Sequence, residues 1–522
     1  MIGLFILLKV LMLLHFSCTC ALQQYPPPKK RIVLASLGLL GHAVPLARIG
    51  AELAVLCCER IENCIVDMAS HSNAKLWWEE ETSSVKSSEC LGNFVDLGNL
   101  PSDWGEKLEM VSQDPSLFRG TLSVFTDLYL ETFPQVYFSI KEHLKQASLV
   151  VSDLGTIGAI EGARSLNIPL IIHSPTIWAD AFSQFEHAHW LPAFASGFRK
   201  EMSLTERCLN ALLPRLLSVA LQPALMKVNK FRFEAGLDPH PSSHQVFQDV
   251  RTLSATAFGF DYPRLVSSMH AFVGPIIPKV REELSNDTFS FVSGYSKVIA
   301  VRFGSFVRLE DSATRSLKLA LEQFSSRENS SVIWFDNEEE QKPSVKLPNF
   351  RFEKKTHNIR QHLSVLAHYK TVLSISHCGM ASIQEAIFFS VPVLCIPLVA
   401  DQSDVAARLM DTKAGLVIHR ESLSDPQRIF KEINELVYNL EYSENARKLR
   451  NIFRLSGGRR RAAYHILDGF YSNDHLLVNR TISWQKRIGL DVFVFSMGCV
   501  CSIGFIFSVI VRWRRFLREG FY

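Results

Sequence analysis

The sequence of 522 residues contains no long block of basic residues inside its body, no recognisable internal repeat and no low-complexity tract. Its net charge of +4 is therefore spread along the chain, which argues against nucleic acid as a main partner. Charged residues make up 21% and hydrophobic residues 47%, as in a globular rather than a disordered protein. The length exceeds what one hydrophobic core normally supports, so we expect two or three domains.

Cysteines are few in the part of the chain that can form a compact body. Of the eleven, Cys18 and Cys20 lie in or beside an apolar N-terminal run, and Cys499 and Cys501 lie in an apolar C-terminal run. The other seven are scattered and odd in number: Cys57, Cys58, Cys64, Cys90, Cys208, Cys378 and Cys395. We expect mostly buried thiols, with room for one or two bridges. The first three lie near His71, but their spacing fits no usual zinc site, and we interpret them as helix core.

The two ends of the chain carry long apolar runs. Residues 1–21 are typical of a secretory signal peptide cleaved near Ala21, and an N-terminal membrane anchor is the alternative. Residues 488–511 are long enough to cross a hydrocarbon core of ~30 Å, and their one charge, Asp491, lies near the start. The arginine-rich tail at 512–522 predicts a cytosolic C-terminus.

This topology places the body on the lumenal or extracellular side, held by a single C-terminal span. Three N-glycosylation sequons agree with that side, at Asn286, Asn329 and Asn479.

The rest of the chain alternates short apolar runs with segments of helical period. Ile32–Ala35 predicts a buried parallel strand, followed by a glycine-containing loop and a helix from Val44. Asp153 ends another such strand before a turn and a helix. This alternation predicts an α/β protein with two facing Rossmann-like domains, at 22–275 and 276–455.

The stretch "SHCGMASIQEA" follows an apolar strand of the second domain. The strand ends at His377, and a helix is expected from about Ala381, so its N-terminus offers free N–H groups suited to phosphate. Gly379 allows close backbone approach, and Ser382 adds a hydroxyl. Glu385 lies one turn on, where it can accept from the sugar hydroxyls of a nucleotide. The alternative is an ordinary N-capped helix with a surface glutamate.

The longer segment "HCGMASIQEAIFFSVPVLCIPLVADQ" resembles the signature of the UDP-glycosyltransferase family, of the UDP-glucuronosyltransferase type. The resemblance implies the GT-B fold. It also implies that His377 and Ser382 hold the diphosphate, that Glu385 binds the ribose hydroxyls, and that Asp401 and Gln402 bind the donor sugar.

Further segments extend the resemblance over nearly the whole chain. "VRFGSF" resembles the family's Phe-Gly-Ser turn, which implies that Gly304 and Ser305 approach the diphosphate. "GGRRRAAYHI" resembles the late helix that packs back on the N-terminal half, so we assign 456–487 to a return helix and juxtamembrane segment. The family's C-terminal span and basic cytosolic tail match the topology given above.

The sequence departs from the family pattern in four places. Ile359 and His362 stand where relatives usually have the tryptophan that stacks on uracil and the glutamine that contacts the nucleoside. Ser390 replaces a glycine, and Ala381 replaces an asparagine common in relatives. Because base stacking contributes roughly 1–3 kcal/mol, the missing aromatic bears on donor affinity or nucleotide choice.

His42 follows the first strand, where the family carries the general base that deprotonates the acceptor hydroxyl. An imidazole pKa near ~6.5 suits a base at neutral pH. Asp153 leaves the same sheet edge, and in the family this aspartate pairs with the histidine. Taken alone, each residue is also typical of a helix cap. The resemblance implies inverting transfer from a UDP-sugar co-substrate without a cofactor, and no metal is expected because the sequence has no Asp-x-Asp triplet.

An aromatic stretch after an N-domain strand is predicted to line the acceptor pocket, through Trp178, Phe182, Phe185 and Trp190. We expect an enzyme of the endoplasmic reticulum membrane that acts on small lipophilic acceptors. Two alternatives stay open: a lipid or sterol glycosyltransferase, and a catalytically weak relative that binds sugar nucleotide or a partner protein. The sequence leaves the sugar, glucuronate or a hexose, and a homo-oligomer undecided.

Overall fold

The computed structural model describes residues 30–59, 64–85, 88–113, 122–177, 190–241, 247, 250–266, 268–278, 284–304, 309–336, 348–354, 359–471, 506 and 508–511. Several predictions lie outside these residues: the signal peptide, most of the C-terminal span, the basic tail, the sequon at Asn479, and the roles of Ser305, Trp178, Phe182 and Phe185. Residues up to Leu467 form one compact unit, and the following residues form a second.

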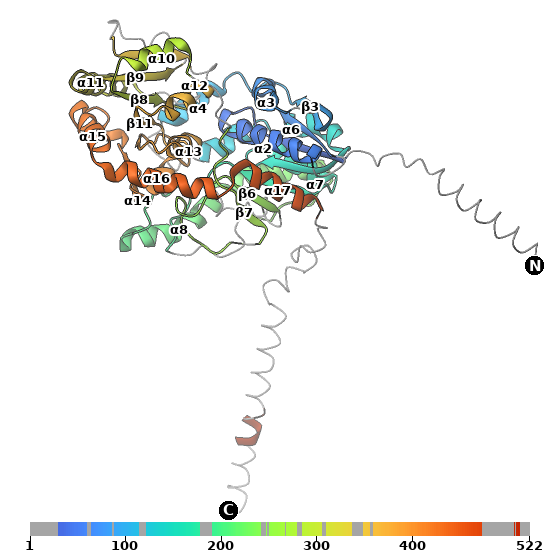
Figure 1. Ribbon diagram of the computed structural model, residues 1–522. Coiled ribbons are helices and arrows are strands. Elements are labelled where there is room, and N and C mark those ends of the chain that lie inside the picture. The colour runs from blue at the N-terminus through green and yellow to red at the C-terminus, as the bar shows by residue number, and fades with distance from the viewer. Residues whose placement is uncertain are drawn as a thin grey trace, which may run out of the picture. The chain divides into compact units, whose positions relative to one another are not determined.

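The N-terminal half is built on a seven-stranded parallel sheet with the order β3-β2-β1-β4-β5-β6-β7 (Figure 1). Its strands are β1 (Lys30–Ala35), β2 (Cys64–Ser70), β3 (Leu91–Asp96), β4 (Ala147–Asp153), β5 (Leu170–Ser174), β6 (Arg251–Ser254) and β7 (His270–Phe272). Its helices are α2 (Leu40–Glu59), α3 (Lys75–Thr82), α4 (Trp104–Gln113), α6 (Phe133–Leu144), α7 (Ile157–Ser165), α8 (Leu204–Ala220) and α9 (Gln222–Glu234). A π-helical segment, η3, covers Val124–Tyr129.

The C-terminal half is built on a six-stranded parallel sheet with the order β10-β9-β8-β11-β12-β13. Its strands are β8 (Lys297–Arg302), β9 (Ser330–Asp336), β10 (Phe350–Lys354), β11 (Thr371–Ser376), β12 (Val393–Cys395) and β13 (Gly415–Val417). Its helices are α10 (Asn286–Ser293), α11 (Asp311–Glu328), α12 (Ile359–Ala367), α13 (Met380–Phe388), α14 (Gln402–Asp411), α15 (Pro426–Tyr438), α16 (Leu440–Leu455) and α17 (Gly458–Tyr471).

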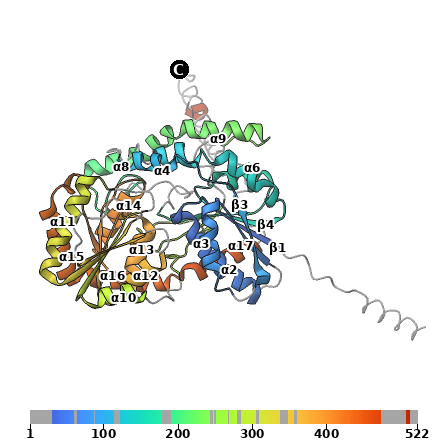
Figure 2. The same cartoon turned by 90° about the horizontal axis from the view of Figure 1, so that it is seen from above.

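Both sheets are covered by helices on two faces, so central strands such as β4 and β8 are largely apolar and buried. The strands β3 and β10, at the ends of the two sheets, carry polar and charged residues. Figure 2 shows the second sheet between α11 and α15 on one face and α12, α13 and α16 on the other. Leu317 of α11 and Ile433 of α15 belong to one core cluster, whereas Ile383 of α13 and Leu449 of α16 belong to the other.

In each sheet, the strand order reverses between two central strands, and the carboxyl ends of those strands form the expected ligand site. In the first sheet the order reverses between β1 and β4, and in the second between β8 and β11. Ligands of such sheets bind outside the carboxyl ends of strands at this reversal. His42 follows β1, Asp153 ends β4, Gly304 follows β8 and His377 follows β11.

Late elements connect the two halves. The N–H of Gly458, at the start of α17, donates to the carbonyl of Val273 at 2.7 Å, and Arg459 pairs with Glu52 of α2 at 3.2 Å. Arg408 of α14 pairs with Asp261 at 2.7 Å. These contacts hold the C-terminal half against loops and helices of the N-terminal half.

Among the described residues, α2 has the length and hydropathy of a membrane span, and 67% of that stretch is buried within the body, as in a core helix. Helices α8 and α9 pass the same test only when they are taken together, and they are bent by 41° at their junction. Of the predicted C-terminal span, the structure describes only residues 506 and 508–511, the latter as a helical turn.

The expectation of mostly buried thiols is wrong. Three disulfides join Cys57 to Cys64, Cys58 to Cys90, and Cys378 to Cys395, with Cα–Cα distances of 5.4, 5.8 and 5.2 Å. The first two tie the end of α2 to the starts of β2 and β3, which the sheet places side by side. Cys208, which is exposed, is the free cysteine among the described residues. The interpretation as helix core is confirmed for Cys57, which is buried in α2, but it is wrong for Cys58, which is exposed, and for Cys64, which begins β2.

Candidate active site

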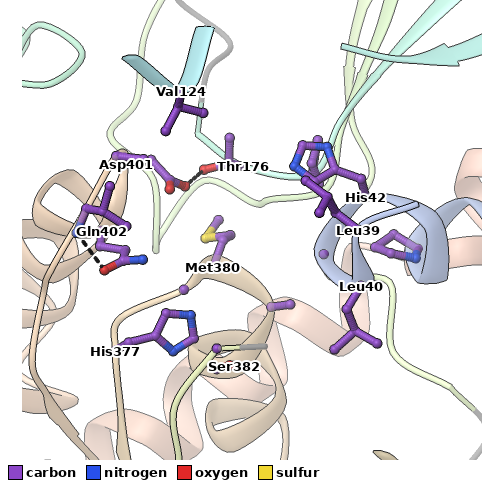
Figure 3. A pocket seen from close by; sticks show the side chains of 18 of the residues that line it. Leu39, Leu40, His42, Val124, Thr176, His377, Met380, Ser382, Asp401 and Gln402 are labelled. Atoms are coloured by element: carbon purple, nitrogen blue, oxygen red, sulfur yellow. Dashed lines mark hydrogen bonds between the residues drawn. The ribbon is translucent and has the colours of Figure 1, made fainter. Parts of the chain in front are cut away.

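A cavity of about 290 Å³ lies where the carboxyl ends of the two sheets face each other (Figure 3). Residues from both halves line it, including His42 on one side and His377 and Ser382 on the other. The strand ends described above thus meet at one site, as the order of strands leads us to expect.

His42 lies in the first turn of α2, two residues after the helix begins at Leu40, and not in a loop before a helix that starts at Val44. Its Nδ1 is 2.8 Å from Oδ2 of Asp153. Because an ionised carboxylate only accepts hydrogen bonds, Nδ1 carries the proton and Nε2 keeps its lone pair. The Asp153 side chain is fully buried, whereas the His42 side chain is 16% exposed.

The loop after β4 fixes the Asp153 carboxylate. Oδ2 also accepts from the N–H of Gly155 at 3.0 Å and from Oγ1 of Thr156 at 3.4 Å. A carboxylate that is held in this way fixes the imidazole tautomer and stabilises an imidazolium, as in other histidine–aspartate pairs.

The charges around His42 favour its protonated form. Burial lowers the pKa of His42, but the charge and hydrogen bond of Asp153 and the charge of Asp401 outweigh it, so the pKa lies above 6.5. Burial and the charge of His42 lower the pKa of the neighbouring His173 to about 4 despite the opposing charge of Asp153. The two histidines therefore differ in direction, because the pKa of His42 is raised and that of His173 is lowered.

His377 lies between Gly304 and Gly379. A larger residue at either position would require the His377 side chain to move. A Cβ atom on Gly304 would come within 2.7 Å of Nε2 of His377, and one on Gly379 within 2.5 Å. Both glycines therefore let the backbone approach the imidazole closely. Gly379 is the N-cap of α13, and Ser382 lies in its first turn, so an anion here would meet free N–H groups.

Glu385 lies at the cavity between two arginines from different halves. Its carboxylate is 3.5 Å from Arg48 of α2 and 3.7 Å from Arg302 at the end of β8. Arg48 also binds Glu81 and the carbonyl of Ile276, each at 3.0 Å. The sequence patterns singled out neither arginine, although Arg48 interrupts the apolar residues of the predicted helix and Arg302 ends the apolar run of the predicted strand.

The residues at the positions of the usual tryptophan and glutamine lie in α12. The structure describes the backbone of Ile359 but not its side chain. His362 is 1% exposed; its Nδ1 accepts from Arg302 at 3.3 Å, and its ring lies edge-on to Phe335 with centroids 5.0 Å apart. Burial and Arg302 lower the pKa of His362 well below 6.5, so the ring is neutral.

Asp401 and Gln402 lie at the start of α14 and line the cavity. The side-chain oxygen of Gln402 accepts from the N–H groups of Leu398 and Val399 at 2.8 and 3.0 Å, which leaves its NH₂ group directed elsewhere. Asp401 accepts from the hydroxyl of Thr176 in the N-terminal half, a residue that sequence analysis missed. Burial raises the pKa of Asp401.

The predicted acceptor residues are represented by Trp190 alone. Trp190 is 52% exposed and is not among the described residues that line the cavity. The apolar lining comes instead from Leu39, Leu108, Val124, Leu128 and Phe194. An aromatic side chain that follows this strand can either face the cavity or lie on the surface. The sequence alone did not distinguish these two positions.

Two facing parallel α/β domains with a cavity between their strand ends define the GT-B class of glycosyltransferases. Medicago truncatula UGT71G1, solved as a complex with UDP-glucose, has a similar fold with a TM-score of 0.58 and 15% identity, over 85% of this chain and 98% of that one.

The family described as "UDP-glucoronosyl and UDP-glucosyl transferase" matches residues 142–519, and the chain belongs to this family. It is 24% identical to UDP-glycosyltransferase stmC of Aspergillus ustus, over 91% of this chain and 95% of that protein. It is 26% identical to UDP-glucuronosyltransferase 3A1 of Xenopus laevis, over 82% and 79%. The protein is therefore a glycosyltransferase that uses a UDP-sugar donor.

Proposed function

We propose that the enzyme transfers glucuronate or a hexose, with inversion, from its UDP-sugar to a hydroxyl of a small lipophilic acceptor. The observation that carries this proposal is the pair His42–Asp153, whose Nδ1···Oδ2 distance is 2.8 Å and whose imidazole lies across the cavity from His377. The apolar cavity wall supports a lipophilic acceptor.

In the proposed reaction, Nε2 of His42 takes the proton of the acceptor hydroxyl as its oxygen attacks the anomeric carbon. The bond from that carbon to the diphosphate oxygen breaks, and UDP leaves with the electron pair from the opposite face. An α-linked donor therefore gives a β-linked product. Asp153 stabilises the imidazolium that forms.

The donor side of the cavity would balance the charge that develops on the leaving diphosphate. The first turn of α13, Ser382 and His377 lie where N–H and O–H donors can meet it, and Ser305 joins them in the family pattern. Asp401 and the NH₂ group of Gln402 are the candidates for the sugar hydroxyls. These groups would act without a metal ion, and we expect transfer to persist in EDTA.

Product stereochemistry tests the proposal directly. The purified enzyme would be incubated with UDP-glucuronate, UDP-glucose, UDP-galactose and UDP-xylose and a panel of small phenols and sterols. The anomeric proton of each product would be read by NMR. We expect a β-glycoside, with phenols preferred over sterols. An α-glycoside would contradict the inverting mechanism, and preference for sterols would favour the lipid-acceptor alternative.

A second candidate, a binder with weak activity, is favoured by one contact. Glu385, the proposed ribose ligand, already faces Arg48 and Arg302. UDP binding without transfer to any acceptor would support this candidate.

We also propose that the body is lumenal, in the endoplasmic reticulum membrane, with one C-terminal span and a basic cytosolic tail. Three disulfides in the body support an oxidising compartment. The arginine-rich tail and the sequons support the same orientation.

A further inference from the structure

The catalytic nitrogen of His42 already has a hydrogen-bond partner in this structure. The hydroxyl of Tyr129 is 3.2 Å from Nε2, and the two rings meet edge-on with centroids 5.7 Å apart. Because Nδ1 donates its proton to Asp153, Nε2 is the acceptor and the Tyr129 hydroxyl is the donor. Asp153, His42 and Tyr129 thus form a row of two hydrogen bonds, with Tyr129 on the cavity side.

Local packing places the tyrosine at this point. Tyr129 is the last residue of the π-helical segment η3 and lines the cavity. A Cβ atom on Gly155 would come within 3.1 Å of its ring, so the glycine after β4 leaves the space that the ring uses. The same Gly155 donates its N–H to Asp153. One loop therefore sets both partners of His42.

A neutral imidazole nitrogen offers a single lone pair in the plane of its ring. The acceptor hydroxyl must donate to that lone pair before its proton can be transferred. Tyr129 and the acceptor therefore compete for the same position on Nε2.

We propose that Tyr129 is a positioning residue that occupies the place of the acceptor hydroxyl on His42 in the free enzyme and is displaced when the acceptor binds. This inference rests on the proposed role of His42 as the base. The Tyr129 hydroxyl keeps Nε2 hydrogen-bonded when the site holds no acceptor. Because the acceptor must displace this hydroxyl, its affinity is lower.

The competing hydrogen bond also affects the titration of His42. Donation from Tyr129 to Nε2 stabilises the neutral ring, which opposes the negative charges of Asp153 from β4 and Asp401 from the start of α14. His173 of β5, whose pKa burial lowers to about 4, is neutral in the range where His42 titrates. Removing the Tyr129 hydroxyl therefore shifts the titration of His42 to higher pH.

The test is Tyr129→Phe in the full-length enzyme, with Tyr137→Phe as the matched control. Tyr137 is a buried tyrosine of α6 in the same half, and its hydroxyl accepts from Lys141 at 3.1 Å, away from the cavity. Since one hydrogen bond contributes about 0.5–1.5 kcal/mol, Tyr129→Phe should raise kcat/KM for the acceptor about two- to tenfold through a lower KM. Tyr137→Phe should leave kcat/KM unchanged.

A second readout does not depend on turnover. The His42 ring would be titrated by NMR in the acceptor-free protein, and Tyr129→Phe should move its midpoint to higher pH, whereas Tyr137→Phe should not. An unchanged midpoint, or a lower kcat/KM, would overturn the proposal. If His42→Ala also transfers sugar normally, the base assignment itself has failed.

Should Tyr129→Phe fold poorly, 3-fluorotyrosine at position 129 keeps nearly the same shape and donates more strongly. It should raise the acceptor KM and move the His42 midpoint to lower pH. Shifts in the opposite direction would contradict the proposal.

Discussion

At the scale of single residues, the charge of Asp153 is what adapts His42 to the role of base. Asp153→Asn keeps the size of the side chain but removes the charge that, with its hydrogen bond, raises the pKa of His42 against burial. In the proposed mechanism the neutral ring is the active form, so wild-type kcat/KM should rise with pH through a midpoint above 6.5. In the variant we expect that midpoint to fall and the plateau to drop about 10²-fold or more, because the imidazolium is no longer stabilised.

A pH–rate profile of kcat/KM checks this expectation. Asp103→Asn is the control, since Asp103 is a half-exposed residue that pairs with Lys107 at 2.9 Å. An unshifted midpoint in Asp153→Asn would show that Asp153 does not control the protonation of His42.

Ser390 has a backbone conformation that favours glycine. It follows α13 with φ of +65°, and its buried hydroxyl has no partner among the described residues. Because a side chain in the left-handed region costs roughly 1–2 kcal/mol, Ser390→Gly should stabilise the protein by about 1 kcal/mol. Ser326→Gly, within α11, should destabilise it by about the same amount.

Chemical denaturation of both variants measures the difference. A loss of stability in Ser390→Gly equal to that of Ser326→Gly would mean that backbone strain at Ser390 is negligible.

At the scale of elements, the sequence indicated where strands end better than where helices begin. Apolar runs placed β1 and β4 within one or two residues, since parallel strands are buried on both faces. The glycines around His42 suggested a longer loop, but α2 begins at Leu40 and includes Gly41 in its first turn.

Contacts between distant elements were harder to predict. The disulfide Cys58–Cys90 depends on the end of α2 lying beside the start of β3, which only the sheet order reveals. Arg48 of α2 and Arg302 of β8 meet at Glu385 only because the two halves face each other at the cavity. The sequence signature therefore identified the donor loop but not the charges packed against it.

The contact of α13 with these two arginines leads to a prediction. Glu385→Ala leaves Arg48 and Arg302 buried without this carboxylate, so it should weaken UDP binding and lower stability by about 3 kcal/mol. In the double variant with Arg302→Ala, stability should largely return, because one uncompensated charge is gone, whereas UDP affinity should stay low.

Calorimetry with UDP and thermal denaturation separate the two effects. If Glu385→Ala binds UDP like the wild type, Glu385 does not contact the ribose. If the double variant regains UDP affinity, the single variant acted only through the uncompensated arginine.

At the scale of the whole molecule, the site exists only where the two halves face each other. The proposed base and its aspartate belong to the N-terminal half, and the proposed diphosphate loop belongs to the C-terminal half. Thr176 and Asp401 join the halves at the rim of the cavity. Donor binding and proton abstraction are thus assigned to separate halves, and substitutions should affect them separately.

The proposed orientation in the membrane belongs to this scale. In sealed microsomes, protease should leave the body intact and remove only the short basic tail. Detergent should make the body accessible, and deglycosylation should increase its mobility on a gel. Digestion of the body in sealed vesicles would contradict the lumenal assignment.

The most direct test of the central claim is His42→Ala, assayed for both sugar transfer and UDP binding. His143→Ala is the matched control, because His143 forms another histidine–aspartate pair in the same half, with Asp67 at 2.8 Å, and does not line the cavity. If His42 is the general base, His42→Ala should lower sugar transfer about 10²–10⁴-fold while UDP affinity stays nearly unchanged. His143→Ala should keep both. Transfer by His42→Ala at the wild-type rate would show that His42 is not the base.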